Sequence, residues 1–201
     1  MKITDIKQQV KRQGRYSIYI EGKYSFSLSE AELLKSTIRI GKDYSEAELE
    51  ELQDTAVLDK ANMRALDYLS RRPRSEWEVR DYLKRKDYDS PTVDTILNKL
   101  SDYGYIDDLK FAQAWISNRR MLKPTSLRRL QQELMQKHVS REVVEQALQT
   151  DEGDEQSALK ELIDKKRHQT RYQDEQKMVA YLLRQGFNYS DIKAILKNEE
   201  I

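Results

Sequence analysis

Residues 83–97 read LKRKDYDSPTVDTIL, and a similar pattern returns as LMQKHVSREVVEQAL at 134–148 and as LLRQGFNYSDIKAIL at 182–196. Each stretch opens on a leucine, with an apolar residue five positions later, a branched aliphatic residue at ten and an apolar pair at thirteen and fourteen. This spacing favours two short helices that bury their apolar faces together. The opening leucines are 51 and 48 residues apart, and a period of this length is typical of a stacked array of repeats.

A further helix is predicted ahead of each pair, because each unit begins with a pair of apolar residues followed by a larger one. These sets are Ala65-Leu66 with Leu69, Phe111-Ala112 with Trp115, and Ala158-Leu159 with Leu162. We therefore expect a mainly α fold, an elongated array of three tandem three-helix repeats at 63–107, 108–152 and 153–201. One such unit is too small to bury its apolar face alone, so neighbouring repeats must cover it.

Polar residues mark the predicted helix ends. A serine suited to N-capping lies at the start of the third helix of each repeat: Ser90, Ser140 and Ser190. Between the first two repeats, Gly104 is expected to end a helix in the left-handed conformation, and Asp107 or Asp108 to cap the next one. The acidic join at 150–155 is less well marked, and we interpret it as a hinge.

The N-terminal extension, residues 1–62, predicts a small β-hairpin followed by helices. Alternating side chains favour strands at 4–11 and 15–20, and a turn then leads into a second alternating run at 24–28. Residues 38–41 predict one further short strand.

Two capping boxes predict helices in the same extension. Ser29 with Glu32 opens a short helix, and Ser45 with Glu48 opens a longer one, because the hydroxyl and the carboxylate each satisfy a free backbone N–H. Whether the longer helix breaks near residues 54–55 is left open by the sequence.

Composition limits the class of protein. The chain has 201 residues, of which 35% are charged and 38% hydrophobic, and its formal net charge is +1. Its longest run without a polar break, 178–183, is far shorter than the ~20 residues that cross a bilayer, and no apolar signal segment is visible. Because cysteine is absent, disulfides and thiolate zinc sites are excluded. We expect a cytoplasmic protein with no membrane partner.

No set of residues predicts catalysis, a metal site or a cofactor. The two histidines, His138 and His168, lie thirty residues apart, and we expect both to be solvated. The six glycines are dispersed and form no phosphate-binding loop. Asp107 and Asp108 could attract a metal, but helix capping explains them more simply. The sequence therefore indicates a protein that is not an enzyme.

Positive charge gathers at equivalent places in the three repeats, near the loop between the first and second helices and along the second helix. Stacked repeats would bring these side chains into one basic stripe, which could bind phosphate or a partner's carboxylates. A solvated helix face is the simpler interpretation of any single arginine, with Trp77 and Trp115 in the core, but the recurrence favours a function. The candidate interface residues are Arg71, Arg72, Arg74, Lys84, Arg85, Arg119, Arg120, Lys123, Arg128, Arg129, Lys165, Lys166 and Arg167.

Three of these stretches resemble the RecX family. Residues 65–75 with Leu83 are similar to its opening, 100–112 (LSDYGYIDDLKFA) carry its most specific motif, and 129–137 resemble its second unit. The resemblance covers roughly 63–196 and implies tandem three-helix modules in a curved array. It also implies a regulator of the RecA recombinase that binds the RecA–DNA filament, modulates ATP hydrolysis and strand exchange in recombinational repair and the SOS response, and usually inhibits.

The chain departs from the family's pattern at two places. The family often has glycine where this chain has Pro124-Thr125-Ser126, and Lys-Gly where it has Lys137-His138. Because Thr125 or Ser126 can still cap the following helix, we expect an altered loop and an intact fold.

Two other functions stay open beside a RecA regulator. Three-helix units resemble helix-turn-helix domains, whose second helix enters the major groove, so a direct DNA-binding module is the main alternative. A protein-interaction scaffold unrelated to DNA is the other. The expected partners are the RecA filament and DNA, the latter bound weakly or as part of the filament, and we expect a monomer.

Overall fold

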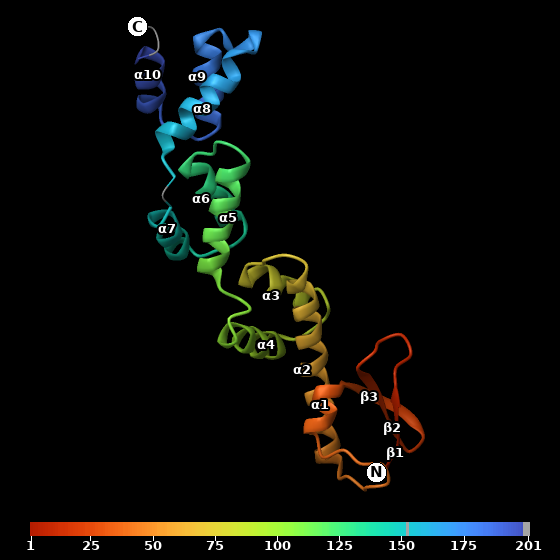
Figure 1. The fold of residues 1–201 in the computed structure, drawn as a ribbon. Coiled ribbons are helices and arrows are strands. Elements are labelled where there is room, and N and C mark those ends of the chain that lie inside the picture. Colours follow the sequence, from red (N-terminus) through yellow and green to blue (C-terminus); the bar gives the residue numbers. More distant parts are fainter. Residues whose placement is uncertain (152, 199–201) are drawn as a thin grey trace. The chain divides into compact units, whose positions relative to one another are not determined.

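The computed structural model describes residues 1–151 and 153–198. The chain is mainly α-helical with a small N-terminal β-sheet, as the sequence predicts (Figure 1). It divides into two compact units. The first unit holds Met1–Pro73 and Val79–Tyr105, and the second holds Arg74–Glu78 and Ile106–Ile201.

The first unit begins with the predicted hairpin, extended by one more antiparallel strand. The order in the sheet is β1 (Ile3–Gln8), β2 (Arg15–Ile20), β3 (Lys23–Ser29). Ile18 of β2 pairs with Phe26 of β3, and both are buried in the core of this unit. The predicted strands are confirmed, although the first ends at Gln8 and not at residue 11.

The strand predicted at 38–41 is wrong. The chain meets β1 near here through isolated bonds. The N–H of Gly41 donates to the carbonyl of Ile3 at 2.9 Å, the N–H of Ile3 donates to the carbonyl of Lys42 at 3.4 Å, and Lys2 forms an isolated bridge with Asp43. Because a strand needs a continuous ladder and this segment supplies separate bonds, it stays irregular.

The helix α1 (Glu30–Lys35) has half of its predicted capping box. The Ser29 hydroxyl accepts from the N–H of Glu32, as predicted, but the N–H of Ser29 donates to Asp59 at 2.8 Å. Asp59 is held there because it also forms a buried ion pair with Arg15, 3.3 Å between Nη1 and Oδ2. The carboxylate of Asp59, from α2, therefore replaces that of Glu32 as the acceptor for the N–H of Ser29.

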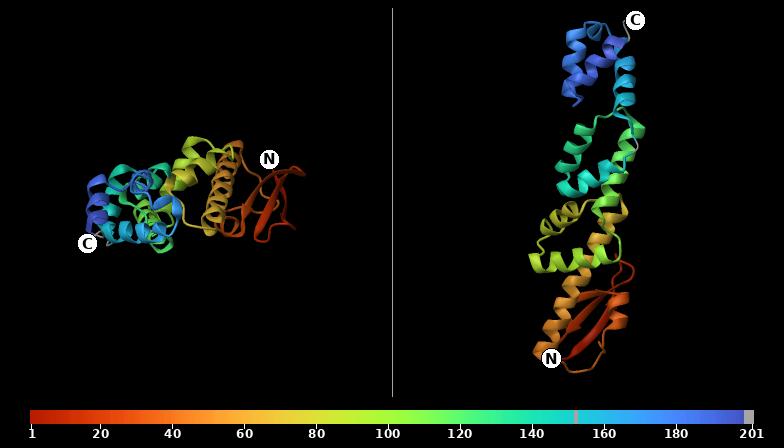
Figure 2. Two further views of the ribbon diagram at one scale, coloured as in Figure 1. Left: turned by 90° about the horizontal axis from the view of Figure 1, so that it is seen from above. Right: turned by 90° about the vertical axis from the view of Figure 1, so that its left-hand side faces the viewer.

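The helix α2 (Glu46–Ser70) opens on the complete capping box of Ser45 and Glu48. It continues unbroken through residues 54–55 and crosses the predicted boundary between residues 62 and 63 (Figure 2). Near its start, Leu49 and Ala56 pack into the core beneath the sheet. Its second half supplies the first helix of repeat 1.

Repeat 1 is completed by α3 (Glu76–Lys84) and α4 (Ser90–Asp102). The N-cap of α4 is Asp89, whose Oδ1 accepts from the N–H of Thr92 at 3.1 Å, so the predicted cap Ser90 is wrong by one position. The aspartate ahead of the serine takes the cap, and Ser90 and Pro91 become the first helical residues. The buried side chains of this repeat are Ala61, Ala65, Val79, Leu83, Val93, Ile96, Leu97 and Leu100.

Repeat 2 comprises α5 (Asp108–Leu122), α6 (Leu127–Gln136) and α7 (Arg141–Gln149). Ser126 caps α6 and Ser140 caps α7, each by accepting from the N–H three residues later, and both predictions are confirmed. The core side chains are Phe111, Ala112, Ile116, Leu130, Leu134, Val139, Val144 and Ala147.

Repeat 3 comprises α8 (Glu155–Arg167), α9 (Glu175–Arg184) and α10 (Tyr189–Asn198), with a 3-10 turn, η1 (Thr170–Tyr172), between the first two. The predicted cap Ser190 is wrong, because α10 has already begun at Tyr189. The core side chains are Ala158, Leu159, Leu162, Ile163, Met178, Leu182, Phe187, Ile192 and Leu196.

In each repeat, the turn after the second helix contains one residue in the left-handed conformation. The φ angles are +64° at Asp87, +56° at His138 and +94° at Gly186, each four residues after the opening leucine. Residues other than glycine adopt this region at some cost. This explains the departure at Lys137-His138, since His138 occupies a position suited to glycine without changing the turn.

In the second unit, a serine hydroxyl binds the backbone next to two of these turns. The Ser126 hydroxyl donates to the carbonyl of Gln185 at 2.7 Å, next to Gly186, and the Ser75 hydroxyl donates to the carbonyl of Lys137 at 2.8 Å. Both serines are fully buried. A carboxylate completes each contact: Glu155 accepts from the N–H of Leu127, and Asp108 from the N–H of Glu76.

Candidate partner interface

Two of the candidate arginines in repeat 2 neutralise a buried carboxylate. Glu133 of α6 is only 9% exposed. Arg119 of α5 donates to both of its oxygens, at 2.7 Å from Nε and 2.9 Å from Nη2, and Arg129 reaches Oε1 at 3.4 Å. The indole N–H of Trp115 adds a fourth donor, from a third residue, at 3.1 Å. Arg119 and Trp115 therefore hold α5 against α6, whereas Arg129 reaches Glu133 from within α6.

Arg120 anchors the join between repeats 2 and 3. Its Nη2 donates to Asp151 at 2.7 Å, and its Nη1 donates to the carbonyl of Thr125 at 2.9 Å. A second carbonyl, that of Gly153, lies 3.4 Å from Nη2. These bonds tie the loop before α6 to the acidic join that the sequence interprets as a hinge. The hinge itself stays a prediction.

The loop between α5 and α6 is fixed from within. The N–H of Lys123 donates to the carbonyl of Arg119 at 3.1 Å, and the Thr125 hydroxyl donates to the carbonyl of Lys123 at 3.0 Å. Thr125 and Ser126 are buried, whereas Lys123 and Arg128 are exposed. Neither of these two cations forms an ion pair with any residue that the structure describes. They are the cations of this loop that are available to a partner.

In repeat 1, part of the candidate set forms surface ion pairs, each with an aspartate four residues earlier in the chain. Arg71 pairs with Asp67 at 2.9 Å and Arg85 pairs with Asp81 at 2.7 Å, and such exposed pairs contribute little to stability. The remaining candidates here are Arg72, whose Nη1 donates to the carbonyl of Pro73, Arg74, which is partly buried, and Lys84, which is exposed.

In repeat 3, the three candidates lie at the end of α8. Lys165 pairs with Glu161, and Arg167 is exposed. The ammonium of Lys166 lies over two rings, 5.7 Å from the centroid of Tyr172 and 5.3 Å from that of Tyr181. Cation–π contact of this kind holds Lys166 in place.

One basic position recurs in all three loops. Arg72, Lys123 and Arg171 each lie eleven residues ahead of the opening leucine of their repeat. Arg171, which is also exposed, lies 5.8 Å from the ring of Tyr172. The alignment of these positions into one stripe stays a prediction.

The two tryptophans have different environments, and the simpler interpretation, with both in the core, is wrong for one of them. Trp115 packs against the core of repeat 2, whereas Trp77 is 40% exposed. Trp77 stacks on the imidazole of His138 with ring centroids 3.8 Å apart. His138 is exposed, as expected, and one face of its ring is covered by Trp77. Periodicity could not reveal this contact, which joins residues 61 positions apart.

The neighbouring carboxylates Asp107 and Asp108 differ in environment. Asp107 caps α5, and the N–H of Lys110 that it accepts lowers the pKa of its carboxyl, so capping by Asp107 is confirmed. Burial raises the pKa of Asp108, the hydrogen bond from the N–H of Glu76 opposes this rise, and repulsion from the carboxylates of Glu76, Asp107 and Glu78 adds to it. Both carboxylates thus have a role at a helix start: Asp107 caps α5, and Asp108 accepts from the first N–H of α3, that of Glu76.

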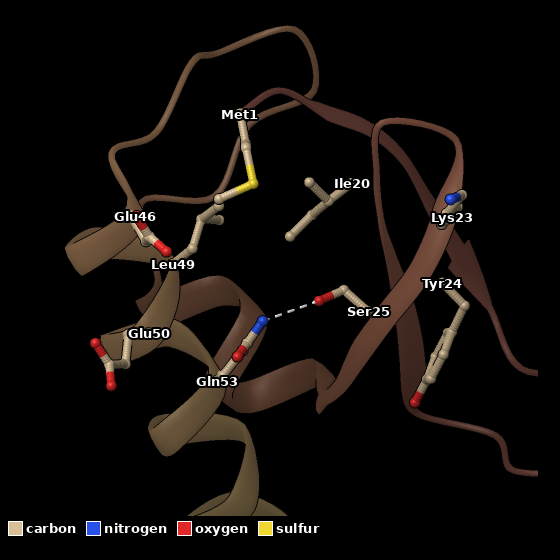
Figure 3. Close-up of a pocket in the computed structure, with 9 residues that line it drawn as sticks. All are labelled: Met1, Ile20, Lys23, Tyr24, Ser25, Glu46, Leu49, Glu50 and Gln53. Carbon is tan, nitrogen blue, oxygen red and sulfur yellow. Dashed lines mark hydrogen bonds between the residues drawn. The ribbon is translucent and has the colours of Figure 1, made fainter.

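A hollow of about 440 Å³ opens between the hairpin and α2 in the first unit (Figure 3). Ile20 and Leu49 lie on its two sides, and Gln53 of α2 donates to the Ser25 hydroxyl of β3 at 3.2 Å. No candidate cation lines it. Among residues 1–151 and 153–198, no group of three or more His, Cys, Asp or Glu could hold a metal ion. Over the same residues, no helix has both the length and the apolarity to cross a bilayer.

Four family models match most of the chain. The "Regulatory protein RecX N-terminal domain" matches residues 1–44. The three models that follow are described as the first, second and third three-helix domains of RecX, and they match residues 63–100, 107–148 and 153–196.

Named relatives and solved structures agree with these models. "Regulatory protein RecX" of Listeria monocytogenes serotype 4a is 34% identical over 192 residues, which is 93% of this chain and 71% of the relative. The protein of the same name from Bacillus pumilus is 32% identical over 200 residues, 97% of this chain and 76% of the relative. The crystal structure titled "Crystal structure of regulatory protein RecX" is 30% identical, with a TM-score of 0.75 and 98% of both chains covered. A second structure, of RecX from Lactobacillus salivarius, is similar in fold, with a TM-score of 0.62 over 70% of this chain and 95% of the other.

Proposed function

This chain belongs to the RecX family, and from that premise we propose that it binds the RecA–DNA filament and inhibits RecA-driven ATP hydrolysis and strand exchange. The relatives are named regulatory proteins, which supports a role in regulation without catalysis. RecA acts on chromosomal DNA, so the proposed site of action is the cytoplasm. The further expectation of a monomer is part of the same proposal.

The observation that carries the proposal is the recurrence of a basic loop in three repeats. Arg72, Lys123 and Arg171 occupy equivalent positions, and in repeat 2 the loop is held by buried bonds that leave Lys123 and Arg128 outside. Arg119, in contrast, is paired with the internal carboxylate of Glu133. A repeated, outward charge is what a partner with repeated acidic sites would recognise.

A filament of identical protomers is a partner of this kind. Linked contacts, each weak alone, raise the effective concentration of the next contact and so give avidity. The near-neutral balance of the chain, 36 basic against 35 acidic residues, limits indiscriminate binding to naked DNA. Several protomers held by one chain would be restrained from the rearrangements that hydrolysis and strand exchange need.

Binding is tested by fluorescence anisotropy with labelled single-stranded DNA, either naked or coated with RecA and a slowly hydrolysed ATP analogue. We expect binding to the coated DNA and much weaker, strongly salt-dependent binding to the naked strand. Tight, sequence-selective binding to naked DNA would instead support the helix-turn-helix alternative.

The loop is tested by Lys123→Glu/Arg128→Glu, which removes the outward charges and spares Arg119, Arg120 and Arg129. Because opposite charges meet at the proposed contact, we expect roughly tenfold or greater weakening at low salt, shrinking as salt is added. The control is Lys110→Glu/Arg141→Glu, which makes the same change in net charge at exposed residues of α5 and α7. Equal weakening by both variants would show that only net charge matters.

A further inference from the structure

We infer that Met121 and Leu122, together with Lys123 and Arg128, form a docking point for a protein surface on which an apolar depression is bordered by carboxylates. The inference rests on the proposed function and deepens it: the loop of repeat 2 contacts a recombinase protomer and not DNA. Exposure, rigidity and charge support it independently.

The first observation is the exposure of two large apolar side chains in sequence. α5 buries its apolar face through Phe111, Ala112 and Ile116, which are at most 6% exposed. At its C-terminus, Met121 is 81% and Leu122 is 77% exposed, so neither contributes to the core. Single exposed apolar residues are common, but two adjacent ones at the edge of a basic loop form a small patch that water solvates poorly.

The second observation is that the backbone beneath this patch is fixed. Lys123 N–H bonds to the carbonyl of Arg119, Arg120 bonds to that of Thr125, and the Thr125 hydroxyl bonds to that of Lys123. Ser126 then fastens the end of the loop to the carbonyl of Gln185. A loop ordered before binding loses little conformational entropy when it binds, so even a small patch can contribute to affinity.

The third observation is the charge of the two cations that follow the patch along the chain, in the loop and at the start of α6. Arg119 and Arg120 are neutralised by Glu133 and Asp151, whereas Lys123 and Arg128 have no carboxylate partner among the described residues. An apolar centre with an unpaired basic border complements an apolar site with an acidic border. Phosphate would use the two cations alone, and single-strand binders stack bases on aromatic rings, which Met121 and Leu122 lack.

The test compares Met121→Ser/Leu122→Ser with the unchanged protein by the anisotropy assay on RecA-coated and naked DNA. We expect roughly tenfold weaker binding to the coated strand, in the range of interface hot spots, and unchanged binding to naked single- or double-stranded DNA. Met121→Leu/Leu122→Met keeps the apolar surface and should bind like the unchanged protein. Leu34→Ser, at an equally exposed leucine of α1, is the control for lost surface hydrophobicity and should also be unaffected.

Each outcome decides between the claims. Undiminished binding of Met121→Ser/Leu122→Ser to coated DNA overturns this inference and leaves the proposed function standing. Parallel weakening on naked DNA assigns the patch to nucleic acid and overturns it as well. If the unchanged protein fails to bind RecA-coated DNA, the proposed function falls and this inference with it. Because both side chains are exposed, we expect the thermal unfolding of the double variant to match that of the unchanged protein.

Discussion

Glu133 gives the side chains around it a structural role, because its carboxylate is their hydrogen-bond acceptor. The sequence places it as a lone acid among many cations, and that count alone could not show that it is buried. Arg119 and Arg129 come from different helices and converge on it with Trp115. Burying a carboxylate is costly unless donors surround it, so these donors belong to the fold. The candidate set is thereby reduced to the cations that no internal acid holds.

Glu133→Ala should lower the free energy of unfolding by about 2–4 kcal/mol, because it leaves a partly buried guanidinium and an indole N–H without their acceptor. The measurement is urea unfolding followed by circular dichroism. Glu145→Ala is the matched control: it removes an exposed ion pair with Arg141 and should cost no more than about 0.5 kcal/mol. A cost for Glu133→Ala as small as that of the control would contradict the structural role of Arg119.

The adjacent residues Asp107 and Asp108 should respond to charge removal in opposite directions. The pKa of Asp107 is lowered, so its ionised form stabilises the fold above its unfolded value of 3.8, and this stability is lost as the pH falls through the folded pKa. The pKa of Asp108 is raised, so its ionised form costs stability at neutral pH, and protonation removes that cost as the pH falls through the raised pKa toward 3.8.

At neutral pH, Asp107→Asn should therefore unfold at lower urea concentration than the unchanged protein, and Asp108→Asn at an equal or higher one. Asparagine can keep the acceptor for the N–H of Glu76, so the Asp108→Asn variant isolates charge from hydrogen bonding. Asp108→Asn should converge on the unchanged protein as the pH falls through the raised pKa toward 3.8, whereas Asp107→Asn should do so only below 3.8, as the pH falls through the lowered pKa. Destabilisation by Asp108→Asn at neutral pH would count against a raised pKa.

At the level of the elements, regular spacing was informative and local signals were less so. The leucine-anchored pattern predicted the second and third helices of every repeat, because an apolar face must return every three to four residues. Two of the errors fall where one polar residue competes with another: Asp89 displaces Ser90, and Asp59 replaces Glu32 at Ser29. Choosing between such neighbours depends on tertiary distances that spacing does not contain.

Ser126 has two roles that sequence could only half predict, since it caps α6 and also donates to Gln185 in repeat 3. Ser126→Ala should lower the free energy of unfolding by about 2 kcal/mol, because it removes a cap and leaves the partly buried carbonyl of Gln185 without its donor. Ser140→Ala removes a cap alone and should cost about 1 kcal/mol. Both are measured by urea unfolding, and equal losses would show that the bond to Gln185 contributes nothing.

For the molecule as a whole, the repeat pattern predicts which positions are equivalent but not which residues far apart in the chain bind each other. Periodicity identifies equivalent positions, so Arg72, Lys123 and Arg171 could be found without coordinates. It does not identify partners far along the chain, such as Asp151 for Arg120, and so it overcounts the free cations. The exposure of Met121 and Leu122 could not be predicted for the same reason. From sequence alone, an apolar residue at a helix end is expected in the core, and only the positions of its neighbours show otherwise.

The most direct test of the central claim is the rate of RecA ATP hydrolysis on single-stranded DNA with increasing amounts of this protein. If the chain is a filament regulator, the rate should fall in a saturable way, and Lys123→Glu/Arg128→Glu should need roughly tenfold or more protein for the same effect. A rate that stays constant up to a large excess of correctly folded protein would contradict the account.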